Sequence, residues 1–230
     1  MQVVGVDSCR EGWVSVTWNL DDNTLAPRVH RSFAQLLAFH QDAAAVGVDI
    51  PIGLNEGTPR RCDIAARKVL GPRKTSVFPA PDPRLLFELG WREADSWSRA
   101  LNGKGLSQQT FGILRKTAEV NWAMQGENQD RVFEVHPEVS FWALSGRLAM
   151  TYRKTWPEGY AERRALLETE FGIPLWERED VRKIVPAAPD DLLDATVAAW
   201  TARRVAEGRA ERLPQDPPID RRGLRMEMVF

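Results

Sequence analysis

Two short segments, QVVGVD at residues 2–7 and AAVGVDI at residues 44–50, determine how the rest of the chain can fold. Each is a dense apolar run rich in valine, which is typical of a strand buried on both faces of a sheet. Each also carries the same Gly-Val-Asp motif, so an aspartate follows the apolar run in both. We therefore expect these two segments to be the central strands of one sheet.

The segments between them set the order of the sheet. Residues 13–18, WVSVTW, alternate between apolar and polar side chains, as a half-buried strand does. Residues 25–32 predict a third strand, and Pro27 assigns it to a sheet edge because proline cannot donate to a ladder. Residues 33–40 then show apolar side chains at helical spacing. This order implies that the first three strands are antiparallel and that the fourth returns parallel to the first.

The later segments complete an α/β fold. Residues 131–135, RVFEV, predict a fifth strand, giving a mixed five-stranded sheet with helices on both faces. The helix expected at 159–171 carries scattered charge and should be exposed, whereas the last helix is apolar nearly all round and should be buried. One domain can use all 230 residues. The helices expected after the fourth strand are 62–70, 108–125, 137–144, 159–171 and 190–208.

The composition fits a folded protein without a membrane segment. With 43% hydrophobic residues and a formal net charge of -1, global disorder is excluded. No basic region followed by an apolar run opens the chain, and no window approaches the roughly 18 apolar residues of a membrane helix. Cys9 and Cys62 suggest neither a disulfide framework nor a paired-cysteine metal site, so we expect a cytoplasmic protein. The near-neutral charge leaves a nucleic-acid partner open, because partners respond to local patches.

Residues 51–107 form a long insertion rich in proline and glycine, which we expect to be irregular apart from its one helix. Within it, residues 58–74 carry six basic groups and a single acid, Asp63. This pattern predicts either a solvated surface helix or a phosphate-binding patch. Trp91 and Trp97 are candidates for stacking on bases or for an interface, including one with a second copy of the chain. The six basic groups are Arg60, Arg61, Arg67, Lys68, Arg73 and Lys74.

Asp7 and Asp49 end the two Gly-Val-Asp segments. If those strands are adjacent and parallel, both carboxylates emerge at the carboxyl edge of the sheet, where open α/β sheets bind their ligands. Two neighbouring carboxylates are costly to bury unless a cation neutralises them, and oxygen ligands favour Mg²⁺ or Mn²⁺. The alternative is that each aspartate only caps the turn after its strand. Their place on two adjacent central strands favours the metal site.

Three further acids belong to the candidate site. Asp191 and Asp194 lie three residues apart at the start of the last helix and therefore share one face, and Ala195 and Ala198 would let that face approach the sheet. Taken alone, the pair is better explained by a helix cap and a first-turn acid that stabilises the helix dipole. Glu134 is a charge inside the fifth strand, an unusual place for a buried side chain.

The order of elements and acids resembles the ribonuclease-H-like fold, which carries an acid on its first strand, another on its fourth and one or two on a late helix. Asp7, Asp49, Asp191 and Asp194 stand in those places. More closely, the chain resembles domain-of-unknown-function family 429, the predicted ribonuclease-H-like nucleases. Relative to a typical ribonuclease H, residues 51–107 are an insertion. The resemblance is carried by VGVDSCREGW, VGVDIPIGL, RRCDIAAR with GPRKTSVFPAP, GLSQQ, EVHPEVSF, DDLLDATVAAWTA and GLRMEMV, which span nearly the whole chain.

The resemblance implies hydrolysis of phosphodiester bonds in DNA or RNA by two divalent ions, Mg²⁺ or Mn²⁺. Asp7 would bridge the ions, Asp49 and Asp194 would each hold one, and Asp191 or Glu134 would supply the remaining ligand. The substrate phosphates would be bound by Arg60, Arg61, Arg73 and Lys74, with Lys116 as a further candidate that a surface role suits better.

Three other functions fit parts of this sequence. A kinase or ATPase of the actin-like kind shares the sheet, but it needs two such domains and a glycine-rich phosphate loop, which VGVDSCREG is not. A non-catalytic nucleic-acid-binding domain would need the basic patch but not the acids. A hydrolase of a small nucleotide or phosphoester would need the metal but would not cut polymers. The substitution Asp49→Asn separates the catalytic functions from the binding one.

Overall fold

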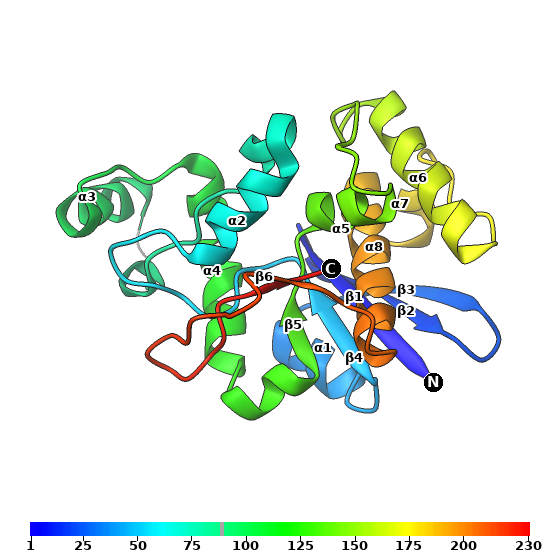
Figure 1. Ribbon diagram of the computed structural model, residues 1–230, viewed down its shortest axis with the longest axis horizontal. Coiled ribbons are helices and arrows are strands. Elements are labelled where there is room, and N and C mark those ends of the chain that lie inside the picture. The colour runs from blue at the N-terminus through cyan, green and yellow to red at the C-terminus, as the bar shows by residue number, and fades with distance from the viewer. Residues whose placement is uncertain (88–89) are drawn as a thin grey trace.

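The centre of the molecule is a five-stranded sheet with the strand order β3-β2-β1-β4-β5 (Figure 1). The computed structural model describes residues 1–87 and 90–230. β1 pairs antiparallel with β2, and β2 with β3, whereas β4 is parallel to both β1 and β5. This is the ribonuclease-H-like topology, so the predicted fold class is confirmed. The strands are β1 (Gln2–Cys9), β2 (Gly12–Asn19), β3 (Thr24–His30), β4 (Ala45–Val48) and β5 (Val132–Glu134).

The two Gly-Val-Asp strands are the central ones, as the sequence predicts. Val4 of β1 and Val46 of β4 are fully buried. They pack on one face of the sheet against α1 (Phe33–Phe39) and α4 (Gln108–Ala123). Pro27 lies in β3 at the sheet edge, as expected for a residue without an amide hydrogen.

Glycine in both central strands lets α8 (Pro189–Ala206) approach the opposite face of the sheet. Gly5 and Gly47 are register partners. A Cβ on Gly5 would lie 2.0 Å from the carbonyl oxygen of Ala195, and one on Gly47 would lie 2.9 Å from that of Ala198. The helix backbone therefore lies directly against the strands. The prediction that small residues on the last helix allow a close approach to the sheet is confirmed.

Two more helices, α5 (Pro137–Leu144) and α6 (Pro157–Phe171), complete this face of the sheet. The expectation of an exposed helix at 159–171 is wrong, because α6 buries Tyr160, Leu167 and Phe171. The apolar stripe is obscured in the sequence by Arg163, which is also buried. A short helix, α7 (Val181–Ile184), precedes α8.

The insertion contains more regular structure than the sequence predicts. The expected helix is α2 (Arg61–Leu70), but a second helix, α3 (Trp91–Asn102), lies where an irregular chain was expected. α3 buries only Ala94 and Ser98, so it carries little of the apolar periodicity by which helices are recognised. Two 3₁₀ turns, η1 (Gly71–Ser76) and η2 (Pro83–Leu85), connect the helices. Figure 1 shows α2 and α3 on one side of the central strands and α6 on the other.

The last residues of the chain return to the sheet. β6 (Arg212–Leu213) pairs with β7 (Met228–Val229), and Val229 forms a parallel bridge to Val135 just after β5. Within residues 1–87 and 90–230, no helix has the length and apolar character needed to cross a bilayer.

Candidate metal centre

Three aspartates from three separate elements meet at the carboxyl edge of the central strands. Asp7 of β1, Asp49 just after β4 and Asp194 of α8 each offer a carboxylate oxygen, and these oxygens lie within 4.8 Å of one another. Asp7 and Asp49 come together because β1 and β4 are parallel, and the Asp49 amide donates to the carbonyl of Val6 at 2.9 Å. Alternate residues of a strand share one face, so both aspartates lie on the same face as Gly5, the face that α8 covers.

Burial and mutual repulsion disfavour the ionised form of the three carboxylates unless a positive charge lies nearby. Asp7 is 5% exposed and Asp194 is 1% exposed. Burial, followed by repulsion from Asp49 and Asp194, raises the pKa of Asp7 well above its ordinary value. Burial and the charge of Asp194 likewise raise the pKa of Asp49 to about 7. A cation bound between the carboxylates would reverse these effects, because it favours the ionised form of every group.

One cation already reaches the cluster from a loop that sequence reasoning did not single out. The ammonium group of Lys154 forms a salt bridge with the carboxylate of Asp194. The charge of Asp194 raises the pKa of Lys154 well above its ordinary value, and Asp7 and Asp49 add to the shift. Lys154 is therefore held in its charged form. The only signal in the sequence is the basic pair Arg153–Lys154 between two helices, which has no fixed spacing to any acid.

Asp191 stands at the margin of the cluster. One of its carboxylate oxygens accepts a hydrogen bond from the backbone amide of Ala188 at 3.2 Å, so it caps the start of α8. Burial, with repulsion from Asp190, raises the pKa of Asp191 to about 6. The side chain lines the same pocket as Asp7 and Asp194. The expectation that Asp191 is the N-cap is wrong, because α8 starts earlier with Ala188 as its N-cap and Asp191 is an acid of the first turn. The role of Asp191 as a metal ligand stays a prediction.

Glu134 and Arg60, expected to bind metal and phosphate respectively, are instead paired with each other. Arg60 is 2% exposed, and its guanidinium donates to both carboxylate oxygens of Glu134, at 2.7 and 2.8 Å. Arg60 also donates to Asp63 at 2.6 Å, and Glu134 accepts from the amide of Ile52 at 2.7 Å. This buried network joins the start of α2 to β5. Arg60 is buried and not part of a solvated patch, and both oxygens of Glu134 accept hydrogen bonds from Arg60 or Ile52. Both side chains line the same pocket as the three aspartates, and their roles at metal and phosphate stay predictions.

A pocket of about 620 Å³ opens above the three aspartates. Its walls come from the η1 turn and the segment after it on one side, and from residues 153–155 on the other. His136 lines it as well, and its Nδ1 is buried without a hydrogen-bond partner in the part of the chain that the structure describes. Arg73 lines the pocket and lies 3.7 Å from Glu138. Of the four basic residues expected at substrate phosphates, Arg60 and Arg73 line the pocket. Arg60 is 2% exposed, whereas the side chain of Arg73 is 21% exposed and its guanidinium remains near the surface.

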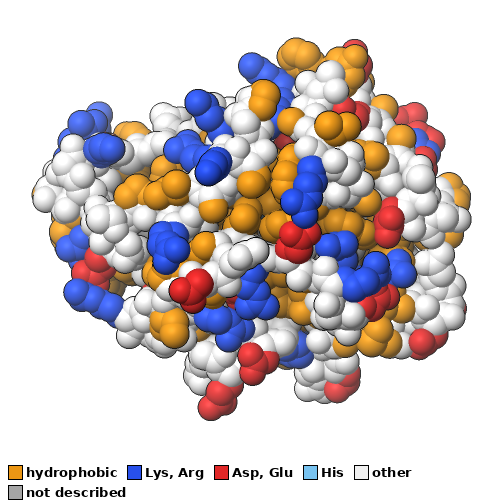
Figure 2. All heavy atoms as spheres, viewed as in Figure 1, with side chains coloured by type: hydrophobic (Ala, Val, Ile, Leu, Met, Phe, Trp, Pro, Cys, Tyr) orange, Lys and Arg blue, Asp and Glu red, His pale blue; other side chains and the backbone are white. Residues whose placement is uncertain are grey.

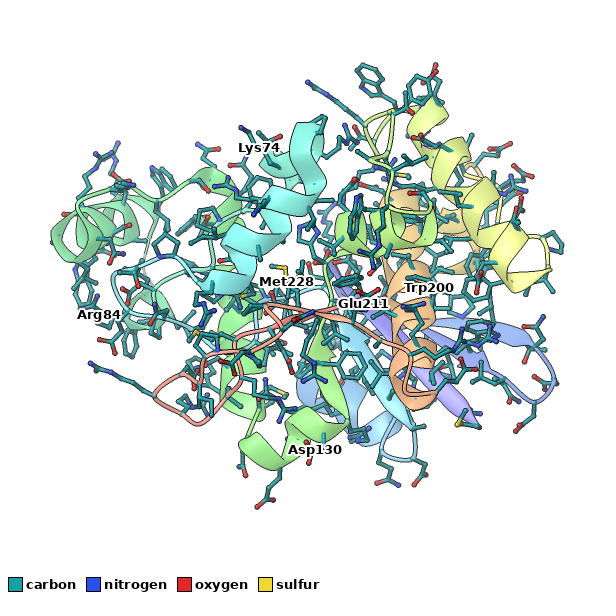
Figure 3. All side chains as sticks on the ribbon, in the orientation of Figure 1. Lys74, Arg84, Asp130, Trp200, Glu211 and Met228 are labelled. Atoms are coloured by element: carbon teal, nitrogen blue, oxygen red, sulfur yellow. The ribbon has the colours of Figure 1, made fainter. Side chains whose placement is uncertain are left out.

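The remaining basic candidates lie outside the pocket lining. Arg61 and Lys74 are exposed on α2 and η1, and Figure 3 shows Lys74 at the end of α2 away from Met228. Lys116 lies over the ring of Trp13 at 4.8 Å and 3.6 Å from Glu119. Its side chain is 20% exposed and packs within α4 and against β2, and a contact of Lys116 with substrate stays a prediction. Contact of Arg61 and Lys74 with a substrate stays a prediction.

Comparison with known protein families identifies the chain. The profile of the family "Protein of unknown function (DUF429)" matches residues 5–219. The chain belongs to the DUF429 family. Searches of curated proteins and of solved structures found no significant match.

Within this DUF429 chain, the matched range includes the whole aspartate cluster and Lys154, and it ends before β7. The sequence resemblance to family 429 is thereby confirmed at the level of the family. The family description states no activity, so we infer the function of this DUF429 protein from the geometry and charge of its site.

Proposed function

We propose that this protein is a divalent-metal-dependent nuclease, which hydrolyses phosphodiester bonds of nucleic acid. The observation that carries the proposal is the meeting of Asp7, Asp49 and Asp194 within 4.8 Å at the floor of a pocket. The position of this cluster, at the carboxyl edge of the central strands, is where α/β sheets place their ligands.

The donor set fits Mg²⁺ or Mn²⁺. The ligands are carboxylate oxygens, which hard divalent cations prefer over nitrogen or sulfur. Among the residues that the structure describes, Lys154 is the one cation in a salt bridge with the three carboxylates, so negative charge exceeds positive charge in the cluster. Asp7, Asp49 and Asp194 would hold the ions, with Asp7 contributing to both and Asp191 supplying the remaining ligand. When bound, such ions supply a water of lowered pKa and neutralise charge on the phosphate.

The residues of the chain do the binding and orienting. The backbone amide of Ser8 donates to the Asp7 carboxylate at 2.6 Å, which fixes the orientation of that side chain. Lys154 and Arg73 lie at the pocket where the non-bridging oxygens of a phosphate would enter, and Arg153 lines it beside them. In the hydrolysis, water adds to phosphorus, one phosphorus–oxygen bond breaks, and the leaving oxygen takes up a proton.

A hydrolase of a small phosphoester is the second candidate. The pocket volume supports it, because about 620 Å³ lies within the range of about 300–1,000 Å³ typical of small-molecule sites. Both candidates require the same carboxylates. They differ in whether a polymer is cut.

The test is cleavage of labelled single- and double-stranded DNA, RNA, an RNA–DNA hybrid and a four-way junction, each with Mg²⁺, Mn²⁺ or chelator. A small chromogenic phosphodiester is assayed in parallel. Asp49→Asn is the test variant, and Asp130→Asn, whose side chain is 84% exposed and lies away from the pocket, is the matched control (Figure 3). Metal-dependent cutting that Asp49→Asn abolishes and Asp130→Asn keeps supports the nuclease. Hydrolysis of the small diester alone supports the second candidate, and the absence of both reactions contradicts the proposal.

A further inference from the structure

Exposed aromatic side chains lie on the two chain segments that line the pocket near η1 and before α6. Phe78, Tyr152 and Trp156, which we call the aromatic rim, are 43%, 43% and 49% exposed. Phe78 lines the pocket itself, and Trp156 follows directly on the lining residue Thr155. Large aromatic side chains are usually buried, and such a group beside a candidate active site indicates a binding surface.

The rim comes from two segments that are joined across the pocket. Phe78 follows the η1 turn, whereas Tyr152 and Trp156 belong to the loop before α6. Arg73 of η1 donates to the backbone carbonyl of Tyr152 at 2.5 Å and so ties the two segments together. Aromatic rings therefore come from both of these segments, one on the lining residue Phe78 and two beside the lining residues Arg153 and Thr155.

Positive charge accompanies the rings. The guanidinium of Arg153 lies 5.6 Å from the centre of the Trp156 ring. Arg153 lines the pocket and forms no salt bridge with a carboxylate in residues 1–87 and 90–230. Figure 2 shows further Lys and Arg side chains gathered over the region of α2. The entrance is therefore complementary to an anionic ligand, although the floor is acidic.

Rings beside cations are the combination by which proteins bind unpaired nucleic acid. Each unpaired base offers a face for stacking, while the backbone phosphates pair with the cations. In a duplex the base faces are already stacked on one another, so rings at a pocket mouth gain no stacking partner there. Asp7 and Asp194 at the floor are only 5% and 1% exposed, and a flexible strand reaches such buried groups more readily than a rigid duplex.

We propose that the substrate is single-stranded nucleic acid, with its bases stacked on Phe78 and Trp156 and its phosphates bound by Arg73 and Arg153. This inference rests on the proposed function and specifies its substrate class. It also replaces the expectation that Trp91 and Trp97 are the stacking residues. Trp91 packs edge-on against Phe111 at 5.4 Å, and neither tryptophan adjoins a residue of the pocket lining, whereas Trp156 adjoins Thr155 and lies beside Arg153.

The test measures binding of a labelled oligonucleotide and of the matching blunt duplex in chelator, so that cleavage plays no part. Phe78→Ala and Trp156→Ala should each raise the Kd for the single strand about 5- to 150-fold, which corresponds to the ~1–3 kcal/mol of stacking on one base. Arg153→Ala should lower the slope of log Kd against log salt by about 1. Trp97→Ala and Trp122→Ala are the matched controls, because both rings are exposed and neither adjoins a residue of the pocket lining, and they should bind like the unmodified protein.

Phe78→Leu removes the ring but keeps an apolar side chain, so it separates lost stacking from lost packing. Equal binding of duplex and single strand, or unchanged Kd in both rim variants, overturns the inference. In that case the proposed function is still supported if a duplex is cut in the presence of metal and if Asp49→Asn abolishes that cutting. Failure to bind any oligonucleotide overturns the inference too, and hydrolysis of the small diester then decides whether the site is a phosphodiesterase at all.

Discussion

The ammonium group of Lys154 lies against the carboxylate of Asp194, inside a cluster where Asp7 and Asp49 are also present. The side chain of Asp194 is 2% exposed, whereas that of Lys154 is 40% exposed. Lysine therefore supplies from the pocket side part of the positive charge that the buried acids require. The arrangement has consequences for stability, for metal affinity and for the effect of pH.

Lys154 and a bound metal ion would both neutralise the carboxylates of the cluster, so replacing Lys154 should change the effect of the metal on stability. In Lys154→Met the cluster loses the one salt bridge that it forms within residues 1–87 and 90–230, so the metal-free protein should melt at a lower temperature. The rise in melting temperature on adding Mn²⁺ should become larger, because the ion then meets a more negative site. Lys183→Met is the control, since Lys183 forms an exposed pair with Asp180 that contributes little. An equal or smaller rise in Lys154→Met would contradict a role as counter-ion.

Asp7→Asn and Asp49→Asn should abolish hydrolysis while leaving the fold intact. Removing one charge from a repelling group relieves that repulsion, so thermal stability in chelator should be kept or raised. Loss of a residue that only supports a metal ligand costs about 10- to 100-fold, so loss of a ligand itself should cost more than about 100-fold in rate. The measurements are initial rates and calorimetric titration with Mn²⁺. Full activity in either variant would remove that residue from the metal site.

Stability of the metal-free protein should depend on pH through Asp49. The folded state keeps a proton on this group up to about pH 7, whereas the unfolded chain releases it near the ordinary value of 3.8. Between these values the folded state binds more protons, so this group's stabilising contribution is lost as pH rises from about 4 to about 7. Urea denaturation in chelator should therefore show a growing advantage of Asp49→Asn over the unmodified protein as pH increases. A constant difference across that range would mean that Asp49 titrates normally.

The ion pair of Arg60 and Glu134 should contribute to the stability of the fold and not to metal binding. Arg60→Met or Glu134→Gln leaves a buried partner without its counter-charge, which costs about 3–5 kcal/mol of unfolding free energy. The double variant should lose less than the sum of the two single losses, because both remove the same interaction. Folded protein from either single variant should still bind Mn²⁺. A Glu134→Gln protein of normal stability that had lost Mn²⁺ binding would instead make Glu134 a ligand.

The fold and the aspartate cluster could be predicted because they follow from local patterns combined with simple topology. A period of two in the strands and a parallel pairing are enough to place Asp7 beside Asp49. No such rule links Lys154 to Asp194, 40 residues later, or Arg60 to Glu134, 74 residues later. Those contacts depend on how the loops around the pocket fold over the sheet edge.

The glycine of β1 gives a test of how closely the site depends on the contact between helix and sheet. In Gly5→Ala the added Cβ would lie 2.0 Å from the backbone oxygen of Ala195, so α8 must move away from the strand. We expect a loss of at least the ~1–3 kcal/mol typical of overpacking, measured by urea denaturation. Since Asp194 precedes Ala195 on the same helix, weaker Mn²⁺ binding should accompany that loss. Gly112→Ala in α4, where a Cβ meets no atom within 4 Å, is the control and should keep Mn²⁺ affinity and be as stable or more stable. Unchanged Mn²⁺ affinity in a destabilised Gly5→Ala protein would show that Asp194 keeps its place when the helix shifts.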